Sequence, residues 1–208
     1  MEFYETINTR RTIRDFKEAP IDIKVIHRII DAGMKAPTND HMRDWHFLVI
    51  TDVEIIQKLI KKIPKKVSDE RLDWIMKSWK LEDDYQKRMY CDAIPKQYQM
   101  LLNASCVILP LFRQKQNLLQ PKNLSDLNAF ASIWCCVENI LLASTAENYT
   151  CALRIPLGDE QEYARSVMNF PEEYMMPCYI AIGKPAEKAV YNKQKEYELI
   201  NRIHINQW

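Results

Sequence analysis

The sequence RRTIRDF at residues 10–16 is the stretch around which the rest of the chain is organised. It places the guanidinium groups of Arg10, Arg11 and Arg14 close to the hydroxyl of Thr12 and ends on an aromatic side chain. A guanidinium group offers a fixed fork of donors that matches the oxygens of a phosphate, and a neighbouring hydroxyl adds a further bond. The pattern favours a phosphate-binding segment. A solvated basic turn after a short helix is the alternative that any arginine pair allows.

Length and composition indicate a single globular domain over residues 1–208. The chain is 47% hydrophobic and 27% charged, values that exclude disordered, collagenous and low-complexity proteins. Its formal net charge of +1 creates no overall field that would attract nucleic acid or an anionic membrane, so we expect neither partner. Because only Gly33, Gly158 and Gly183 occur, a glycine-rich phosphate loop is excluded. Any nucleotide must be held by side chains and ordinary backbone.

The cysteines and histidines indicate no metal site. Six cysteines lie in apolar surroundings without the spacing of zinc ligands, which is typical of buried thiols in a reducing cytosol. We expect His27 and His46 to be structural, with His46 packed in the core, whereas for His41 a functional and a structural role both stay open. No secretory signal opens the sequence, and polar residues such as Glu138 interrupt the longest apolar stretch. We therefore expect a cytoplasmic protein without a membrane span.

The first quarter of the chain predicts three helices and a strand. Residues 2–9 read as a short helix, and Asp22 caps a second helix that ends near Gly33. Residues 45–50, WHFLVI, predict a buried strand because aromatic and branched side chains dominate them. Asp52 then starts the third helix.

Residues 65–100 differ from the rest because dense charge alternates with aromatic side chains. Two helices are expected there. Aromatic side chains among charges are typical of a half-exposed cover, so this segment is a candidate lid over a pocket. A solvated helical segment whose aromatic side chains reach the core is the equally open alternative.

The second half of the chain predicts strands alternating with helices. Residues 106–112 form a strand in which Pro110 indicates a sheet edge or the strand's end. A polar loop precedes a long helix capped by Ser125, whose apolar surface extends over more than one face and suits contact with a second subunit. A strand, a helix and a last core strand are expected at residues 151–157, 159–168 and 179–183.

The tail, residues 184–208, is too long to be a frayed end. Ile203, Ile205 and Trp208 would be poorly placed in water. We therefore expect the tail to dock on a partner subunit.

The order of these motifs resembles the nitroreductase family of FMN-dependent oxidoreductases. The arginine segment is followed by a helix, by APTN at residues 36–39, and by WHF at the start of the first long strand. The resemblance continues with Asp126 before the long apolar helix, with FPEEY at residues 170–174, and with IGKP at residues 182–185. It ends on the aromatic Trp208 and so covers nearly the whole chain.

The resemblance implies an α+β fold, a three-layer sandwich whose central, mostly antiparallel sheet is flanked by helices. It also implies an intertwined homodimer with FMN in the subunit interface. Arg10, Arg11 and Thr12 would hold the FMN phosphate and ribityl, and Arg14 would approach the pyrimidine edge of the flavin. The remaining cofactor contacts that the family implies are Pro37, Thr38, Asn39 and His41 from the other subunit, Ile155, Pro156, Leu157 and Gly158 beside the reactive nitrogen N5, and Lys193 and Lys195 at the phosphate.

The family's chemistry implies that NADH or NADPH reduces the flavin and that a nitroaromatic, a quinone or a similar small acceptor is then reduced at the same face. No catalytic side chain is required because the flavin carries the reaction. Two alternatives stay open within the fold: a specialised flavin enzyme, dehalogenase-like or flavin-fragmenting, and a non-catalytic FMN-binding dimer. The departures from the usual family pattern are His41, Arg43 and Asp44 before the strand and Glu147, Asn148 and Tyr149 after the long helix.

Overall fold

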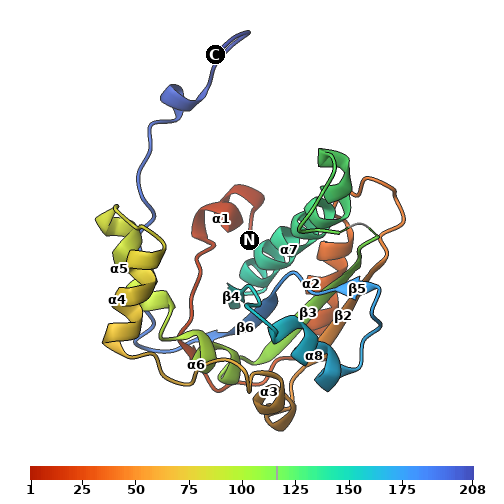
Figure 1. The fold of residues 1–208 in the computed structure, drawn as a ribbon, viewed down its shortest axis with the longest axis vertical. Coiled ribbons are helices and arrows are strands. Elements are labelled where there is room, and N and C mark those ends of the chain that lie inside the picture. The colour runs from red at the N-terminus through yellow and green to blue at the C-terminus, as the bar shows by residue number, and fades with distance from the viewer. Residues whose placement is uncertain (116) are drawn as a thin grey trace.

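A computed structural model describes residues 1–115 and 117–208 of the chain. It consists of an antiparallel sheet with helices on both faces (Figure 1), so the predicted α+β sandwich is confirmed. The strands are β1 (Phe16–Lys17), β2 (Trp45–Ile50), β3 (Cys106–Arg113), β4 (Thr150–Arg154), β5 (Tyr174–Met175) and β6 (Tyr179–Pro185). The helices are α1 (Phe3–Thr9), α2 (Ile23–Met34), α3 (Val53–Leu59), α4 (Asp69–Ser78), α5 (Asp84–Ala93), α6 (Gln97–Leu102), α7 (Asn128–Ala146) and α8 (Glu160–Met168), with short 3₁₀ helices at Leu124–Leu127 and Leu199–Arg202.

The sheet has the order β1-β6-β3-β2, with β4 added to β6 and β5 added to β3. Strand β3 alternates between two cores: Val107 and Leu109 face one of them, and Cys106 and Ile108 face the other. The first core is closed by α3, α6 and α8, and the second by α2 and α7. Burial on both faces explains why the strand is a continuous apolar run in the sequence.

Two glycines permit close approach between elements. A Cβ on Gly33 of α2 would lie 2.8 Å from Cγ1 of Ile140 on α7. A Cβ on Gly183 of β6 would lie 2.9 Å from Cδ1 of Phe16, the aromatic residue that ends the arginine segment. The second contact fixes that segment against the sheet, because Phe16 occupies the space that a side chain at position 183 would need.

Several local predictions need correction. Pro110 lies in a central strand, in register with Phe47, at the point where β3 has finished pairing with β6 and has not yet paired with β5. Its missing N–H therefore interrupts no pairing on that side. Strand β2 lies at the sheet edge and is only partly buried, and the His46 side chain is 64% exposed rather than packed in the core.

Other corrections concern helices and thiols. The side chain of Asn123, rather than Ser125, caps the start of the long helical segment by accepting from the Asp126 N–H. The segment 65–100 contains α4, α5 and most of α6 in place of two helices. Cys91 and Cys135 are exposed, so only four of the six cysteines are buried.

The helical stretch Leu124–Ala146 is long and apolar enough to cross a membrane by length and composition. In this fold it packs on α2 and on the sheet, and Ile133, Cys136 and Ile140 on its inner face are buried. The apolar side chains of this stretch therefore form part of the core between α7, α2 and the sheet.

Candidate functional site

The arginine segment lies along the sheet edge and is held there by its backbone. Thr12 forms a parallel bridge with Cys151, and the Ile13 N–H donates to the Cys151 carbonyl at 3.2 Å. The side chains of Ile13 and Phe16 are buried. These contacts fix the polar residues between them in a partly exposed row.

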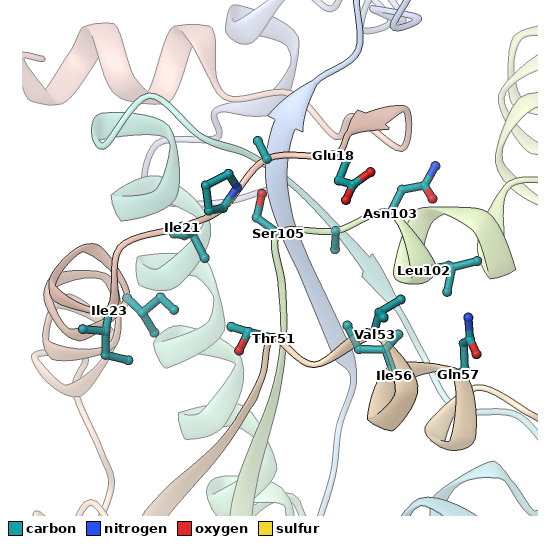
Figure 2. Close-up of a pocket in the computed structure, with 14 residues that line it drawn as sticks. Glu18, Ile21, Ile23, Thr51, Val53, Ile56, Gln57, Leu102, Asn103 and Ser105 are labelled. Carbon is teal, nitrogen blue, oxygen red and sulfur yellow. The ribbon is translucent and has the colours of Figure 1, made fainter.

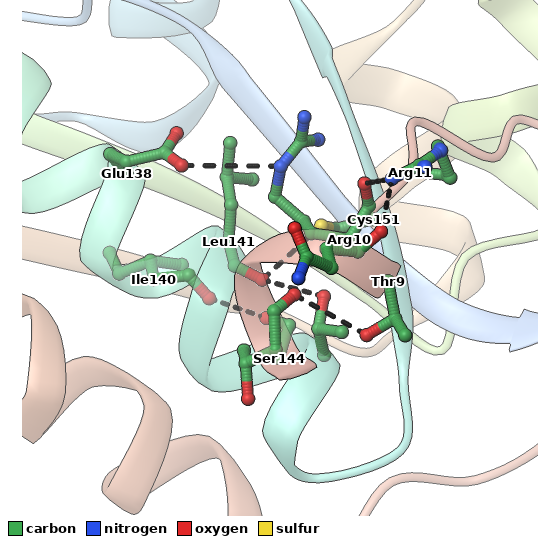
Figure 3. A network of polar contacts seen from close by, with 11 residues as sticks. Thr9, Arg10, Arg11, Glu138, Ile140, Leu141, Ser144 and Cys151 are labelled. Atoms are coloured by element: carbon green, nitrogen blue, oxygen red, sulfur yellow. Dashed lines mark hydrogen bonds and ion pairs between the residues drawn. The ribbon is translucent and has the colours of Figure 1, made fainter. Parts of the chain in front are cut away.

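Arg10 and Arg11 have different surroundings (Figure 3). The Arg10 Nε lies 4.0 Å from the Glu138 carboxylate on α7. The Arg11 Nη1 donates to the carbonyls of Asn8 and Arg10, each at 2.8 Å, and so closes the end of α1. In this structure both guanidinium groups already have an oxygen neighbour, which a bound anion would share or displace.

Arg14 lies deeper, with 15% of its side chain exposed. Burial lowers its pKa, and the carboxylates of Asp92 and Asp15 oppose that effect. Its Nε is buried and has no hydrogen-bond partner among the described residues. Arg14 lines a hollow of about 570 Å³ together with Tyr85 of α5, whose hydroxyl is also buried without a described partner, and with Lys195.

The two lysines of the tail, Lys193 and Lys195, have different surroundings. Lys195 forms an ion pair with Asp83 at the start of α5 and faces the hollow beside Arg14. Lys193 is exposed and forms an ion pair with Glu196 within the tail. The structure thus brings Lys195 to Arg14 and leaves Lys193 at the surface.

The loop after α2 lines a second hollow, of about 460 Å³. The Asn39 N–H donates to Ser132 Oγ of α7 at 3.4 Å, and Thr38 Oγ1 is buried without a partner in the described part of the chain. Pro37 is exposed, and His41 is exposed and adopts a left-handed φ of 59°. This loop lines a different hollow from Arg14, as expected if it serves a neighbouring subunit.

The loop of residues 155–158 follows β4. Ile155 and Leu157 are 51% and 59% exposed, and Gly158 has a φ of 56°, which favours glycine. The Leu157 N–H donates to the Glu160 carboxylate at 3.2 Å, and that carboxylate also pairs with the buried Arg154. The buried ion pair therefore anchors an otherwise exposed loop, which includes Pro156.

Some of the buried polar atoms without a described partner are compatible with FMN. Buried polar groups in proteins are normally hydrogen-bonded, and each exception requires an explanation. Two such exceptions, Arg14 Nε and Thr38 Oγ1, belong to residues that the family resemblance assigns to the cofactor, and a third, Tyr85 OH, belongs to a residue that lines the same hollow as Arg14. A ligand with a phosphate and a ring bearing hydrogen-bonding groups would suit Arg14 and Tyr85, whereas Thr38 lines the separate hollow after α2.

A hollow of about 980 Å³, larger than the two just described, lies elsewhere (Figure 2). It is formed by the loop before α2, the start of α3 and the loop before β3, with Glu18, Val53 and Ser105 in its wall. None of the predicted cofactor residues lines it. No cluster of three or more His, Cys, Asp or Glu residues that could hold a metal ion occurs in residues 1–115 and 117–208.

Sequence reasoning missed three residues around Arg14: Tyr85, Asp92 and Lys96. Asp92 Oδ2 lies 4.0 Å from Arg14 Nη1, and Lys96 joins Asp92 to Asp15. In the sequence, Asp92 and Lys96 form an ordinary i,i+4 helix pair about eighty positions from Arg14. Only the aromatic and charged composition of residues 65–100 pointed to this side of the site.

Comparison with known proteins agrees with this fold. The model of the nitroreductase family matches residues 7–184. The chain belongs to the nitroreductase family. The match starts just before the arginine segment and ends at Lys184 of β6, so it includes the whole sheet except its last residue.

Individual nitroreductase-family relatives are distant in sequence but extend over most of the chain. A "Putative NADH dehydrogenase/NAD(P)H nitroreductase" from Methanothermobacter thermautotrophicus is 25% identical over 100% of this chain and 88% of its own. An iodotyrosine deiodinase from Nematostella vectensis is 22% identical over 90% of this chain and 69% of its own. The crystal structure of a nitroreductase with bound FMN from Bacteroides fragilis superposes with a TM-score of 0.68 at 23% identity and covers 100% of both chains.

Proposed function

We propose that this nitroreductase-family protein is a cytoplasmic FMN-dependent oxidoreductase. FMN would supply the redox chemistry by taking a hydride from NADH or NADPH and passing electrons to a small acceptor such as a nitroaromatic or a quinone. The observation that carries the proposal is Arg14, a mostly buried cation whose Nε has no described partner, beside a hollow that Tyr85 and Lys195 also line. The FMN-bound nitroreductase with the same fold supports this choice of cofactor.

The roles of the chain's own residues follow from their charge and position. Arg10, Arg11 and Thr12 would bind the phosphate and ribityl, and the exposed Lys193 and the nearby Lys195 would complete the phosphate's surroundings. Arg14 would lie at the pyrimidine edge, where its charge stabilises negative charge on the reduced ring. The loop of residues 155–158 would lie beside the ring.

The proposed site requires two chains. The loop of residues 37–41 lines a hollow separate from that of Arg14, so it would reach the flavin of a partner subunit. Phe3 and Tyr4 of α1 are 64% and 77% exposed, and Trp208 of the tail is 99% exposed. Exposed apolar groups of this size support a homodimer in which α1 and the tail are covered.

The test is turnover by the purified protein. NADH or NADPH should be oxidised at a steady rate when FMN and a quinone are present, and rapid mixing without the quinone should show bleaching of the flavin absorbance. Arg14→Ala should lose this activity, whereas Arg28→Ala, which alters an exposed arginine paired with Glu147, should retain it. A protein that binds FMN but oxidises neither nicotinamide would instead be the non-catalytic FMN-binding dimer.

A second candidate is a dehalogenase-like enzyme of the same fold. The iodotyrosine deiodinase relative favours it, and so does the placement of α5 over the Arg14 hollow. Helix α4 has no buried residue, and Trp74 and Trp79 are half exposed, which supports a lid rather than a helical pair that reaches the core. Reductive release of iodide from an iodinated phenol, faster than reduction of a nitroaromatic, would select this candidate.

A further inference from the structure

We propose that Asp92 is a positioning residue for Arg14 and that its negative charge lowers the reduction potential of the bound flavin. Lys96 and Asp15 would tune that charge. The inference rests on the proposed function, because a flavin must lie beside Arg14 for the potential to respond. It assigns a role to a carboxylate on α5, outside the segments that hold the cofactor.

Asp92 is placed directly behind Arg14. The Asp92 side chain is 19% exposed, and its Oδ2 lies 4.0 Å from Arg14 Nη1. That distance is long for a direct hydrogen bond, so the two groups attract each other while the Arg14 Nε stays without a described partner. Arg14 is thus oriented by the carboxylate and keeps a donor for a ligand.

Lys96 explains why the Asp92 carboxylate does not close on Arg14. Its Nζ lies 2.5 Å from Asp92 Oδ1 and 2.8 Å from Asp15 Oδ2. Burial acts to lower the pKa of Lys96, but the hydrogen bonds to Asp15 and Asp92 outweigh it and raise that pKa, so the lysine is charged. The charges of Arg14, Asp92, Lys96 and Asp15 alternate in sign along this row. Their net charge is zero before any ligand binds.

The same carboxylates connect the site to the tail. The Asn192 Nδ2 donates to Asp92 Oδ2 at 3.3 Å, and the Val190 N–H donates to Asp15 Oδ2 at 3.2 Å. Figure 1 shows the start of the tail passing beside α5 before it leaves the body. Arg14, α5 and the tail are therefore linked through one group of polar contacts, in which Asp92 contacts Arg14, Lys96 and Asn192.

The electrostatic consequence has a definite sign. Two-electron reduction gives the flavin ring negative charge, which Arg14 stabilises and Asp92 opposes. Removal of the Asp92 charge should favour the reduced flavin, and removal of the Lys96 charge should favour the oxidised flavin. A purely structural role for the pair would not produce opposite shifts.

The test is the two-electron potential of the FMN-loaded protein, measured by equilibration with a reference dye. Asp92→Asn should shift the equilibrium about tenfold towards reduced flavin, which is about 30 mV for a two-electron couple. Lys96→Gln should shift it in the opposite direction, and Asp92→Glu should restore the wild-type value. Asp84→Asn, on the exposed side of α5, is the matched control and should change nothing.

Two results would overturn the inference in distinguishable ways. If wild-type protein binds FMN and Asp92→Asn leaves the potential unchanged or lowers it, the role of Asp92 is wrong and the proposed function stands. If the wild-type protein shows no flavin spectrum after incubation with FMN, the proposed function fails and the inference fails with it.

Discussion

Arg154 and Glu160 form the most deeply buried ion pair in the described part of the chain, with 9% and 7% of their side chains exposed. Glu160 also accepts the Leu157 N–H, so the pair links the end of β4, the loop of residues 155–158 and α8. A buried pair of this kind contributes little net stability, but loss of one partner leaves a buried charge alone. The pair therefore fixes the loop's position more than it stabilises the fold.

We predict that Glu160→Gln destabilises the protein by about 3–5 kcal/mol, because Arg154 would stay charged and buried. Urea unfolding of the wild type and the variant would measure the difference. Glu147→Gln is the matched control, since its partner Arg28 is exposed, and it should have a much smaller effect. An equal loss of unfolding free energy in the two variants would contradict the claim that burial of Arg154 causes the larger effect.

The buried thiols should be unreactive at neutral pH. Burial raises the pKa of Cys106, Cys136 and Cys151 to about 12, so their thiolate fraction at pH 8 is on the order of one in ten thousand. Iodoacetamide followed by mass spectrometry should label the exposed Cys91 and spare these three. Because folding raises their pKa values, the folded state binds more protons, and stability should fall as pH rises from about 9 towards 12. Labelling of Cys136 as fast as Cys91 would contradict this.

At the residue scale, the sequence predicted candidate cofactor residues that are contiguous in the chain. It missed residues from distant parts of the chain that the fold places beside them. Arg10, Thr12 and Arg14 are contiguous, and their residue types alone suggest a phosphate. Asp92 and Tyr85 come close to Arg14 only through the packing of α5, which no local pattern encodes. Predictions of burial failed for His46 because a strand's place in the sheet depends on partners far along the chain.

Helices α2 and α7 approach each other closely at Gly33. Gly33 faces Ile140 and Cys136, with no room for a Cβ on either side. The contact lies in the middle of the core between the two helices and the sheet, so the helix pair determines where both the Asn39 loop and Ser132 are placed.

We predict that Gly33→Ala destabilises the protein by up to about 2 kcal/mol. Alanine improves helix propensity by about 1 kcal/mol, but its Cβ would meet Ile140 Cγ1 at 2.8 Å, and overpacking typically costs about 1–3 kcal/mol. Thermal unfolding would measure the effect. In an Ile140→Ala background the same change should be neutral or stabilising, and a loss of equal size there would show that the contact is not the cause.

Elements with local signals were predicted well. Asp22 and Asp52 cap α2 and α3 as their spacing indicates, and runs of apolar residues locate β3, α7 and β6. Pro110 did not mark a sheet edge, because a proline interrupts a sheet only where a neighbouring strand would pair with its N–H. On one side of β3, Pro110 lies between the residues that pair with β6 and those that pair with β5. Ser125 misled because Asn123 and Asp126 form a reciprocal cap two residues earlier.

The whole molecule has an unusual amount of exposed apolar surface at two places. Phe3 and Tyr4 extend from α1, and the tail presents Ile200, Ile205 and Trp208. Figure 1 shows the tail leaving the body of the chain. Surfaces of this kind in soluble proteins are normally covered by a partner, which a second copy of the chain would provide here.

We predict that the chain sediments as a dimer of about twice 24.7 kDa and that deletion of residues 199–208 shifts it towards monomer. The deletion removes Ile200, Ile205 and Trp208 but keeps Lys193 and Lys195. Analytical ultracentrifugation at several concentrations would measure the change. Leu119→Ser, at an exposed leucine outside α1 and the tail, is the control and should leave the dimer intact. A monomeric full-length chain would refute the two-chain site.

The most direct test of the central claim is titration of flavin-free protein with FMN, followed by quenching of flavin fluorescence. We predict one FMN per chain, and a loss of about 2–5 kcal/mol of binding free energy when Arg10 and Arg14 are both replaced by alanine, because each charge-assisted bond contributes about 1.5–3 kcal/mol and neighbouring contributions are not fully additive. Arg28→Ala should bind like the wild type. Absence of FMN binding by the wild type, or unchanged affinity in the double variant, would contradict the assignment of residues 10–14 to the cofactor.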